Sequence, residues 1–359
     1  MSGAKLLIVT GEPSGDLHGA RVIKELKRLI PDLHVFGIGG DRLEREGVEL
    51  VYHIKHLAVV GVSEILTKFS HIRRALNLLH QKMLQEKPDA CLLIDYPGFN
   101  LRFAKLVKRE LPSSRVIYYI LPQIWAWGRW RLKTLQRYVD KAISILPFES
   151  QFYKGFNIEF VGHPLLDIIE EKPGAGVSKT IALLPGSRKE EIKRILPVML
   201  ECVTRLPGFN FILSVAPGID IEWVRGFIKD TPVEVVQDRT YEVLSSAVLA
   251  LVASGTATLE TCILETPMLI IYKVSFFSWL LAKLFVKIPH IGLVNIIAGK
   301  EVVPEFIQFN AQPQRIVNNV YHILNNREAV ITALREVKQR LGSAGAPQRA
   351  AHIIHNLLI

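Results

Sequence analysis

The sequence has few cysteines and no long hydrophobic run, and both shortages exclude whole classes of protein. Its three cysteines, Cys91, Cys202 and Cys262, stand in apolar contexts with no spacing that suits a zinc site or a disulfide framework. We therefore expect buried free thiols in a reducing compartment. No apolar stretch reaches the ~20 residues of a membrane-spanning helix, and the first apolar run is too short for a signal peptide. These features predict a cytoplasmic protein.

Motifs that identify common nucleotide, metal and nucleic-acid sites are also missing. The chain has no Asp-x-Asp pair and no His or Cys cluster with metal spacing, so we predict chemistry without a metal or another cofactor. The GxGxxG fingerprint is absent from the glycine-rich stretch 11–19. Lys and Arg are not concentrated in one tract, which argues against a nucleic-acid-binding arm.

What the sequence does have is enough apolar residues for large cores and an excess of positive charge. The 359 residues are 49% hydrophobic and 22% charged, which is typical of a globular protein with two domains. The net charge is +10 at pH 7, and the mean hydropathy is +0.24. The charge indicates an anionic partner, and together with the hydropathy it favours contact with a membrane surface.

Apolar runs alternate with amphipathic stretches along the chain, which predicts an α/β fold with parallel sheets. The polar stretch Glu170–Lys179 contains Gly and Pro and marks a linker. We therefore expect two Rossmann-like domains, over 1–170 and 171–339. The expected strands are Lys5–Thr10, His34–Gly37, Ala90–Asp95, Val116–Ile120, Ala142–Leu146, Glu159–Val161, Thr180–Leu184, Asn210–Ser214, Glu234–Val236, Leu249–Ala253 and Met268–Tyr272.

The clearest candidate for a catalytic residue is a carboxylate that ends a buried run. The apolar run stops at Asp95, and a Tyr-Pro-Gly turn follows at once. In an open α/β sheet this places Asp95 at the carboxyl edge, where ligands bind. It is either a general base toward a sugar hydroxyl or a turn-forming Asp. Asn100 either orients the same substrate or caps a helix over Leu101–Arg109.

Two turns in the second half have the composition of phosphate-binding loops. In each, a glycine lets the backbone approach a ligand, and the helix that follows offers free amides. Taken alone, such a turn is more often structural, with Ser187 as a helix cap and Arg188 as a solvated charge, but two such turns favour one bound nucleotide. Glu260 either accepts hydrogen bonds from ribose hydroxyls or complements a helix dipole. The candidate contacts are Gly186, Ser187, Arg188, Ser254, Gly255, Thr256, Thr258 and Glu260.

The stretch Gly11–Gly19 follows the first strand and is rich in polar residues. It either binds a phosphate or sugar hydroxyls, or it is a tight connection from strand to helix. The candidate substrate contacts in it are Glu12, Ser14, Asp16 and His18.

Three segments are rich in aromatic or aliphatic residues. Gln123–Arg131 contains three tryptophans and two arginines, which indicates a ligand wall, an interfacial surface or core. Ser275–Ile288 predicts an apolar helix whose lysines reach phosphate head groups. The third segment is Leu57–Leu66. Both Ser275–Ile288 and Leu57–Leu66 are either lipid contacts or core. The candidate acyl or membrane contacts are Val59, Val60, Val62, Ile65, Leu66, Phe276, Phe277, Leu280, Leu281, Leu284 and Phe285.

Taken together and in order, these stretches resemble the lipid-A-disaccharide synthase family nearly from end to end. The matching segments are GEPSGDLHGA at 11–20, GIGG at 37–40, VVGVSEIL at 59–66, DYPGFN at 95–100, PQIWAWGRWR at 122–131, ILPFE at 145–149, FVGHPLLD at 160–167, LLPGSRKEEI at 183–192, ASGTATLE at 253–260 and NIIAGKEVVPEFIQ at 295–308.

The resemblance implies a GT-B fold, in which two Rossmann-like domains face a cleft and the last helix, about 340–359, returns to the first domain. It implies transfer of 2,3-diacylglucosamine from UDP to 2,3-diacylglucosamine 1-phosphate (lipid X), with inversion, to give a β-1,6-linked disaccharide. It also implies a metal-independent enzyme on the cytoplasmic face of the inner membrane of a Gram-negative bacterium, in contact with anionic lipids. The resemblance is compatible with both a monomer and a homodimer.

The resemblance also assigns roles to individual residues. Asp95 matches the family's essential acidic residue. The nucleotide-site positions are matched by Arg188, Glu260 and Asn295, and the N-terminal substrate loop by Glu12, Ser14 and Asp16.

Two other functions fit part of the same pattern. A UDP-sugar epimerase on this fold would use the nucleotide turns but would leave the lipid-facing segments unexplained. A non-catalytic peripheral membrane protein would need the basic and apolar surface but not Asp95, Arg188 or Glu260. Release of UDP that depends on an acylated acceptor distinguishes the transferase from both.

Overall fold

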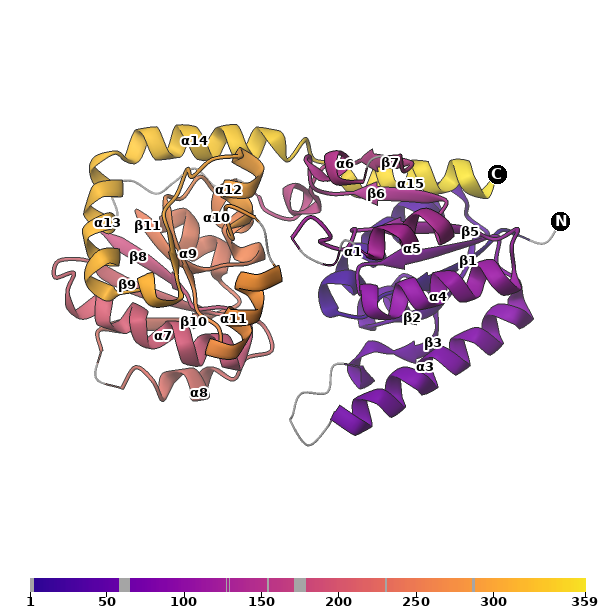
Figure 1. Ribbon diagram of the computed structural model, residues 1–359, viewed down its shortest axis with the longest axis horizontal. Coiled ribbons are helices and arrows are strands. Elements are labelled where there is room, and N and C mark those ends of the chain that lie inside the picture. The colour runs from indigo at the N-terminus through magenta and orange to yellow at the C-terminus, as the bar shows by residue number, and fades with distance from the viewer. Residues whose placement is uncertain are drawn as a thin grey trace. The chain divides into compact units, whose positions relative to one another are not determined.

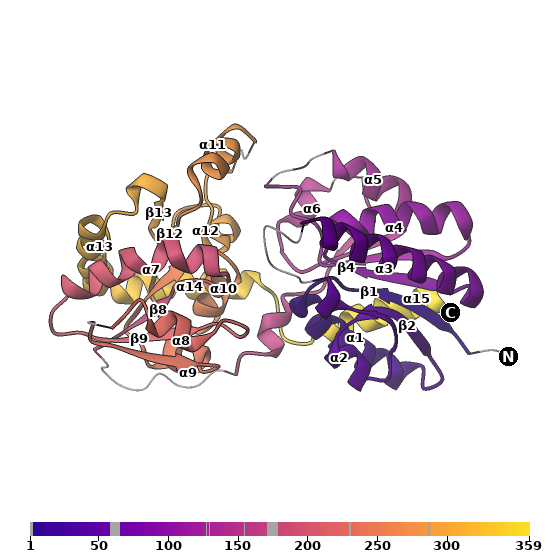
Figure 2. The same ribbon diagram turned by 90° about the horizontal axis from the view of Figure 1, so that it is seen from below.

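The structure is a computed structural model that describes residues 3–57, 65–126, 128, 130–153, 155–170, 179–229, 231–285 and 288–359. The chain divides into two compact units. Unit 1 is Met1–Pro164 with Gly342–Ile359, and unit 2 is Leu165–Leu341. Within each unit a parallel sheet lies between layers of helices (Figure 1; Figure 2).

The sheet of unit 1 has seven strands in the order β3-β2-β1-β4-β5-β6-β7, and every neighbouring pair is parallel. The central strands are unbroken apolar runs, because helices cover both faces of the sheet. All five residues of β4 are fully buried. The strands are β1 Lys5–Val9, β2 His34–Gly39, β3 Glu49–His53, β4 Ala90–Ile94, β5 Arg115–Tyr119, β6 Lys141–Ser144 and β7 Ile158–Phe160.

The helices of unit 1 bury one apolar face each against this sheet or against one another. The helix at the C-terminus, α15, packs on α1 and so adds the end of the chain to unit 1 (Figure 2). The helices are α1 Pro13–Leu29, α2 Asp41–Arg45, α3 Ile65–Glu86, α4 Pro97–Glu110, α5 Arg131–Tyr138, α6 Glu149–Phe152 and α15 Ala346–Leu358, with a 3-10 turn, η1, at Ile54–His56.

The sheet of unit 2 has six parallel strands in the order β10-β9-β8-β11-β12-β13. Its core joins the inner residues of β8, β9 and β11 to the apolar faces of α7 and α13. The strands are β8 Thr180–Leu184, β9 Asn210–Val215, β10 Val233–Gln237, β11 Leu249–Ala253, β12 Met268–Tyr272 and β13 Glu305–Ile307.

One helix of unit 2 continues through a proline. Pro197 lies inside α7, which runs on to Thr204. Pro197 is exposed, so water can bond the carbonyl that it frees, while the apolar period continues on the buried face. The helices are α7 Lys189–Thr204, α8 Ile221–Arg225, α9 Thr240–Ser246, α10 Thr256–Ile263, α11 Phe276–Phe285, α12 Leu293–Ala298, α13 Pro313–Asn325 and α14 Arg327–Arg340, with 3-10 turns η3 Pro164–Asp167 and η4 Gln308–Asn310.

The prediction of two parallel α/β sheets is confirmed, and both predicted strand lists lack one edge strand. In unit 1 the missing strand is β3, whose residues are half-buried or exposed. In unit 2 it is β13, which has three residues. In the described part of the chain, no helix has both the length and the apolar character needed to cross a membrane.

Candidate active site

Asp95 lies where the sequence placed it, directly after β4 at the carboxyl edge of the unit 1 sheet. Its backbone amide donates to the carbonyl of Tyr119 at 3.1 Å, which continues the ladder for one more residue. The chain then turns sharply, because Asp95 and Tyr96 both have positive φ, at 46° and 45°. This conformation is uncommon for Asp and strained for a bulky residue such as Tyr, and such strain is concentrated at functional sites.

Two side chains hold this strained turn through the carbonyl oxygen of Asp95. The Nδ2 group of Asn100 donates to that oxygen at 2.7 Å and to the carbonyl of Ile94 at 3.1 Å. The hydroxyl of Tyr118 donates to the same oxygen at 2.6 Å. Asn100 is buried inside α4, which begins at Pro97, so its predicted role as a helix cap is wrong. Its predicted contact with the substrate stays a prediction. Through its bonds to the carbonyls of Ile94 and Asp95, Asn100 positions the backbone of Asp95.

The carboxyl group of Asp95 has an unusual proton affinity. Burial, with a smaller contribution from the negative charge of Glu12, raises the pKa of Asp95 from 3.8 to about 6. A carboxylate with this pKa is still ionised near neutral pH but is a stronger base than an exposed one. These properties suit a general base.

Glu12 is brought close to Asp95 by tight packing between two loops. Gly11 lies against the ring of Tyr96, and a Cβ atom at position 11 would overlap that ring. Glu12 itself is exposed and is the N-cap residue of α1. The GEPSGD segment and the turn at Asp95 therefore form one surface of unit 1.

The other predicted residues of the substrate loop lie on α1, because the helix already begins at Pro13. Ser14 is exposed. Asp16 is buried, and its carboxylate accepts three backbone amides, from Gly40 at 2.6 Å, Arg42 at 3.1 Å and Leu43 at 3.3 Å. These bonds tie the start of α2 to α1, and the predicted contact of Asp16 with the substrate stays a prediction.

His18 is held in the neutral form beside this loop. Burial, followed by the charges of Arg21 and Arg42, lowers the pKa of His18 to about 4. Its Nδ1 atom is buried and makes no hydrogen bond within the described structure.

In unit 2 the loop after β8 has a different capping arrangement from the one predicted. Arg188, not Ser187, is the N-cap residue of α7, and no side chain of the N-cap makes a capping bond. Instead the carboxylate of Glu191 accepts the backbone amide of Ser187 at 3.0 Å and lies over Gly186, where φ is 116°. The Ser187 amide is therefore occupied by the chain's own carboxylate, and the exposed guanidinium of Arg188 is the group left to meet an anion.

The loop after β11 is more open. Gly255 and Thr256 are exposed at the start of α10, and a Cβ atom at position 255 would meet nothing within 4 Å. The hydroxyls of Ser254 and Thr258 instead bond backbone carbonyls, of Ile291 at 3.3 Å and of Gly255 at 2.7 Å. The backbone at 255–256 thus remains available to a phosphate.

Glu260 lies in the second turn of α10, which begins at Thr256, and is therefore too far from the helix start to complement its dipole. Burial raises the pKa of Glu260, and the hydroxyl of Tyr241 donates to it at 3.1 Å.

Asn295 has no free hydrogen-bonding capacity. Its Nδ2 group donates to the carbonyl of Val303 and the carboxylate of Glu305, both at 2.8 Å, and its Oδ1 accepts the amides of Val302 and Val303. The side chain is fully buried. Its predicted role in direct nucleotide contact is wrong, and it fixes the segment between α12 and β13.

A family model described as lipid-A-disaccharide synthetase matches residues 6–354 of this chain. The chain belongs to the lipid-A-disaccharide synthase family. It is 41% identical over 373 residues to the lipid-A-disaccharide synthase of Anaeromyxobacter sp. (strain K), covering 97% of this chain and 96% of that protein. It is 37% identical over 381 residues to the lipid-A-disaccharide synthase of Coxiella burnetii (strain CbuG_Q212), covering all of both chains.

Solved structures with the same fold are more distant in sequence. The glycosyltransferase of kitacinnamycin matches with a TM-score of 0.68 at 15% identity, and the calicheamicin glycosyltransferase CalG4 with 0.66 at 15% identity. A UDP-GlcNAc 2-epimerase from Neisseria meningitidis matches with 0.59 at 14% identity over 99% of both chains. These matches, with the two parallel sheets, confirm the GT-B fold. Both the family prediction and the prediction of an enzyme are confirmed.

Many of the predicted acyl or membrane contacts lie outside the part of the chain that the structure describes. This holds for Val59, Val60 and Val62 and for the side chains of Ile65, Leu66, Leu281, Leu284 and Phe285. Of the others, Phe276 is 62% exposed, Phe277 69% and Leu280 41%. Trp279 packs between Phe276 and Phe309, so these aromatic rings form one exposed cluster on unit 2.

The tryptophan segment packs beside a buried carboxyl group that the sequence interpretation did not single out. Trp125 is buried and Trp130 is 67% exposed, so the segment is neither wholly core nor wholly surface. Beside Trp125 the carboxyl group of Glu149 is buried, and burial raises its pKa to about 8. The contact between Glu149 and Trp125 joins positions 24 residues apart, so the local sequence ILPFE gave no signal for it.

Proposed function

We propose that the chain transfers 2,3-diacylglucosamine from UDP to the 6-hydroxyl of 2,3-diacylglucosamine 1-phosphate, with inversion at the anomeric carbon. The products are the β-1,6-linked disaccharide 1-phosphate and UDP. The observation that carries this proposal is Asp95, a half-buried carboxylate with a raised pKa on a strained turn at the sheet edge.

Asp95 acts as the general base in this reaction. Its carboxylate takes the proton of the acceptor hydroxyl while the hydroxyl oxygen forms a bond to the donor's anomeric carbon, and the bond from that carbon to UDP breaks. A single base and a leaving group on the opposite face suffice for inversion, and a positioned base contributes ~10²–10⁴-fold in rate. The bonds from Asn100 and Tyr118 fix the Asp95 backbone, which limits the motion of the base.

Unit 2 binds the nucleotide. Arg188 meets the pyrophosphate, and the exposed amides at Gly255 and Thr256 donate hydrogen bonds to the negative charge that develops on it, so that UDP departs without a metal or another cofactor. Glu260, oriented by Tyr241, bonds the ribose hydroxyls.

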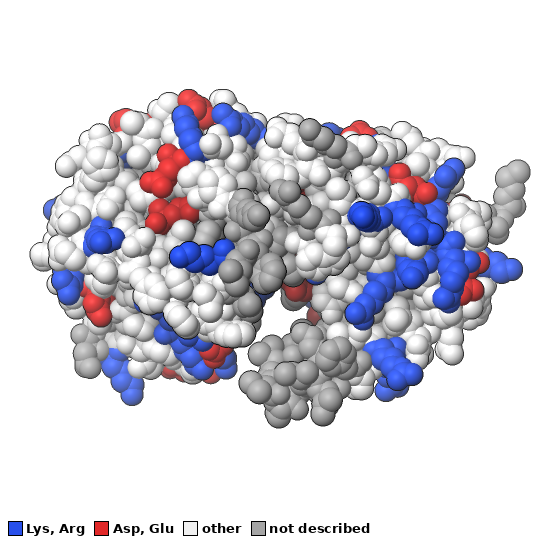
Figure 3. Space-filling view, in the orientation of Figure 1, with Lys and Arg blue, Asp and Glu red and all other residues white. Residues whose placement is uncertain are grey.

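The acyl chains and a membrane surface meet the apolar and basic parts of the protein. The exposed cluster of Phe276, Trp279 and Phe309 offers aromatic rings of the kind that enter a bilayer interface. In Figure 3, Lys and Arg side chains gather over the helices α3, α4 and α5 of unit 1. This charge suits anionic lipids on the cytoplasmic face of an inner membrane.

A UDP-release assay tests the function. Donor alone, donor with acylated acceptor, and donor with acylated acceptor plus Asp95→Asn protein are compared. We expect release only with acceptor present, and a loss of about 10²–10⁴-fold in the variant. Asp32→Asn, which removes an exposed carboxylate from the same unit, is the matched control. Release without acceptor would favour an epimerase, and vesicle binding without any release would favour a non-catalytic membrane protein.

A further inference from the structure

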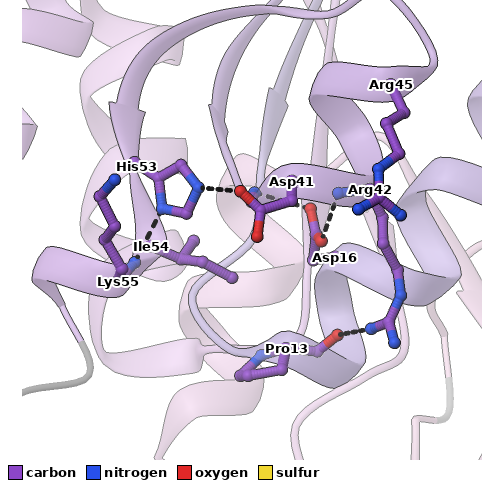
Figure 4. A pocket seen from close by; sticks show the side chains of 9 residues that line it. Pro13, Asp16, Asp41, Arg42, Arg45, His53, Ile54 and Lys55 are labelled. Atoms are coloured by element: carbon purple, nitrogen blue, oxygen red, sulfur yellow. Dashed lines mark hydrogen bonds and ion pairs between the residues drawn. The ribbon is translucent and has the colours of Figure 1, made fainter.

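Unit 1 contains a cavity that no step above uses. It has a volume of about 350 Å³ and lies where β1, β2 and β3 end. Figure 4 shows its lining side chains, which come from the start of α1, from α2 and from the end of β3. They are Pro13, Asp16, Asp41, Arg42, Arg45, His53, Ile54 and Lys55, with the backbone of Gly40.

The acidic side chains of this cavity are already occupied. Asp16 accepts three backbone amides, as described above. Asp41 accepts a bond from the Nε2 of His53 at 3.0 Å, and that bond, with the charges of Arg45 and Lys55, lowers the pKa of Asp41. Both carboxylates therefore already have hydrogen-bond partners within unit 1.

The cationic side chains, in contrast, form no close ion pair, although the charges of Arg45 and Lys55 act on Asp41. Among the described residues, no carboxylate lies within 4.0 Å of the charged groups of Arg42, Arg45 or Lys55. Arg42 donates only a long bond of 3.5 Å, to the carbonyl of Pro13. Three unpaired cations around one cavity match the charge of a phosphate group, and the two guanidinium groups match its geometry.

The cavity is also close to the proposed base along the sheet. In the order β3-β2-β1-β4, the ends of β2 and β4 are separated by β1 alone. With strands about 4.8 Å apart, the two ends lie about 10 Å apart, which is the scale of one hexose carrying a phosphate. Pro13 and Asp16, which line the cavity, belong to the same segment as Glu12, which faces Asp95.

We propose that this cavity binds a phosphate monoester and that Arg42 and Arg45 are its main contacts. Resting on the proposed function, the ligand is the 1-phosphate of the acceptor sugar, held while the 6-hydroxyl at the other end of the same ring meets Asp95. The cavity then selects a phosphorylated acceptor over an unphosphorylated one.

The test compares the double variant Arg42→Gln/Arg45→Gln with the unmodified protein. Both side chains are exposed, and Gln keeps the helical propensity of α2. The measured quantity is the ratio of kcat/KM for the acceptor with its 1-phosphate to kcat/KM for the same acceptor without it. We expect this ratio to fall about 10- to 100-fold, since a hydrogen bond to a charged group contributes that much.

Lys24→Gln/Arg115→Gln is the matched control, because it removes two exposed positive charges of unit 1 outside the cavity. It should leave the ratio unchanged. An equal fall in the control, or no fall in the Arg42→Gln/Arg45→Gln protein, would overturn the proposal. A second arm measures binding to phosphatidylglycerol vesicles. Loss of vesicle binding in the cavity variant with an unchanged ratio would assign the cavity to bulk lipid head groups instead of the acceptor.

Titration with glucosamine 1-phosphate, followed by phosphorus NMR, separates this proposal from the proposed function. We expect binding to the unmodified protein and weaker binding to the cavity variant, whether or not transfer occurs. Binding without any transfer would refute the proposed reaction and leave the phosphate site standing. Transfer that shows neither an altered ratio nor altered sugar-phosphate binding would refute the phosphate site alone.

Discussion

Replacing Glu12 by Gln should move the acid limb of the pH–rate profile to lower pH. The reason is the electrostatic surroundings of Asp95, whose pKa is raised first by burial and second by the charge of Glu12. Only the ionised carboxylate can take the acceptor's proton, so kcat/KM should rise with pH through the pKa of this group in the free enzyme.

The structure bounds the size of the shift. The pKa of Asp95 is raised from 3.8 to about 6, and the difference of roughly 2 units corresponds to about 3 kcal/mol in proton affinity. The substitution removes the charge of Glu12 but not the burial, which is the larger cause. The limb should therefore move below 6 but stay above the ordinary value of 3.8. At pH 7 the unmodified base is already ionised by about ten to one, so ionisation adds little activity there.

The assay is UDP release at subsaturating acceptor between pH 4.5 and 8, with Asp32→Asn as a control that removes an exposed carboxylate elsewhere in unit 1. The control should keep the limb near 6. If the limb of the Glu12→Gln protein stayed in place or moved up, the electrostatic link between the two loops would be refuted. If Asp95→Asn protein retained the same limb, the titrating group would be another residue.

Four further outcomes follow from the same contacts. Asp95→Asn should keep or raise the Tm at pH 7, because it removes a buried charge and Asn tolerates positive φ; a clear fall in Tm would contradict this. Gly11→Ala should lower both Tm and kcat, because its Cβ would overlap the Tyr96 ring, and an unchanged kcat would show that the turn does not need this packing. Glu149→Gln should flatten the decline in unfolding free energy between pH 6.5 and 8.5. In the unmodified protein the folded state keeps a proton up to about pH 8 that the unfolded chain loses near 4.5, so stability falls as pH rises through this range; urea midpoints measure it, and a retained slope would exclude Glu149. Phe276→Ser/Phe277→Ser should weaken vesicle sedimentation without lowering Tm, because both rings are exposed.

The fold followed from the sequence wherever a strand is covered on both faces. The ranges of β8, β11 and β12 agree with prediction to the residue, because an unbroken apolar run ends sharply at a polar or turn residue. The two missed strands lie at the edges of their sheets. There burial is partial and the run is short, so neither periodicity nor length separates a strand from a loop.

For the candidate site, the sequence predicted the positions of residues better than their bonding partners. The position of Asp95 at the sheet edge was predicted, because it depends only on the local pattern of strand and turn. The bonds that Asp16, Asn100 and Asn295 make to the protein itself were not predicted, because a polar side chain in a motif can bond a ligand or the protein's own backbone with equal chemical fitness. The partners decide between the two, and those of Asp16 lie 24 to 27 residues further along the chain. The role of Glu191 was not predicted for the same reason, because its carboxylate accepts the backbone amide of Ser187.

Contacts of the protein with its own backbone hold the strained turn at Asp95. Two consecutive residues with positive φ cost on the order of 1–3 kcal/mol each, and a hydrogen bond contributes about 0.5–1.5 kcal/mol. The bonds from Asn100 and Tyr118 to the Asp95 carbonyl, and the packing of Gly11 on Tyr96, oppose that strain. The amide group of Asn100 and the hydroxyl of Tyr118 are thus used on the backbone, while the Asp95 carboxylate receives the amide of Tyr96. A fold that needed only a turn here would not require a half-buried, weakly solvated carboxylate at its apex. The structure favours a base at this position because the surrounding residues preserve its basicity instead of neutralising it.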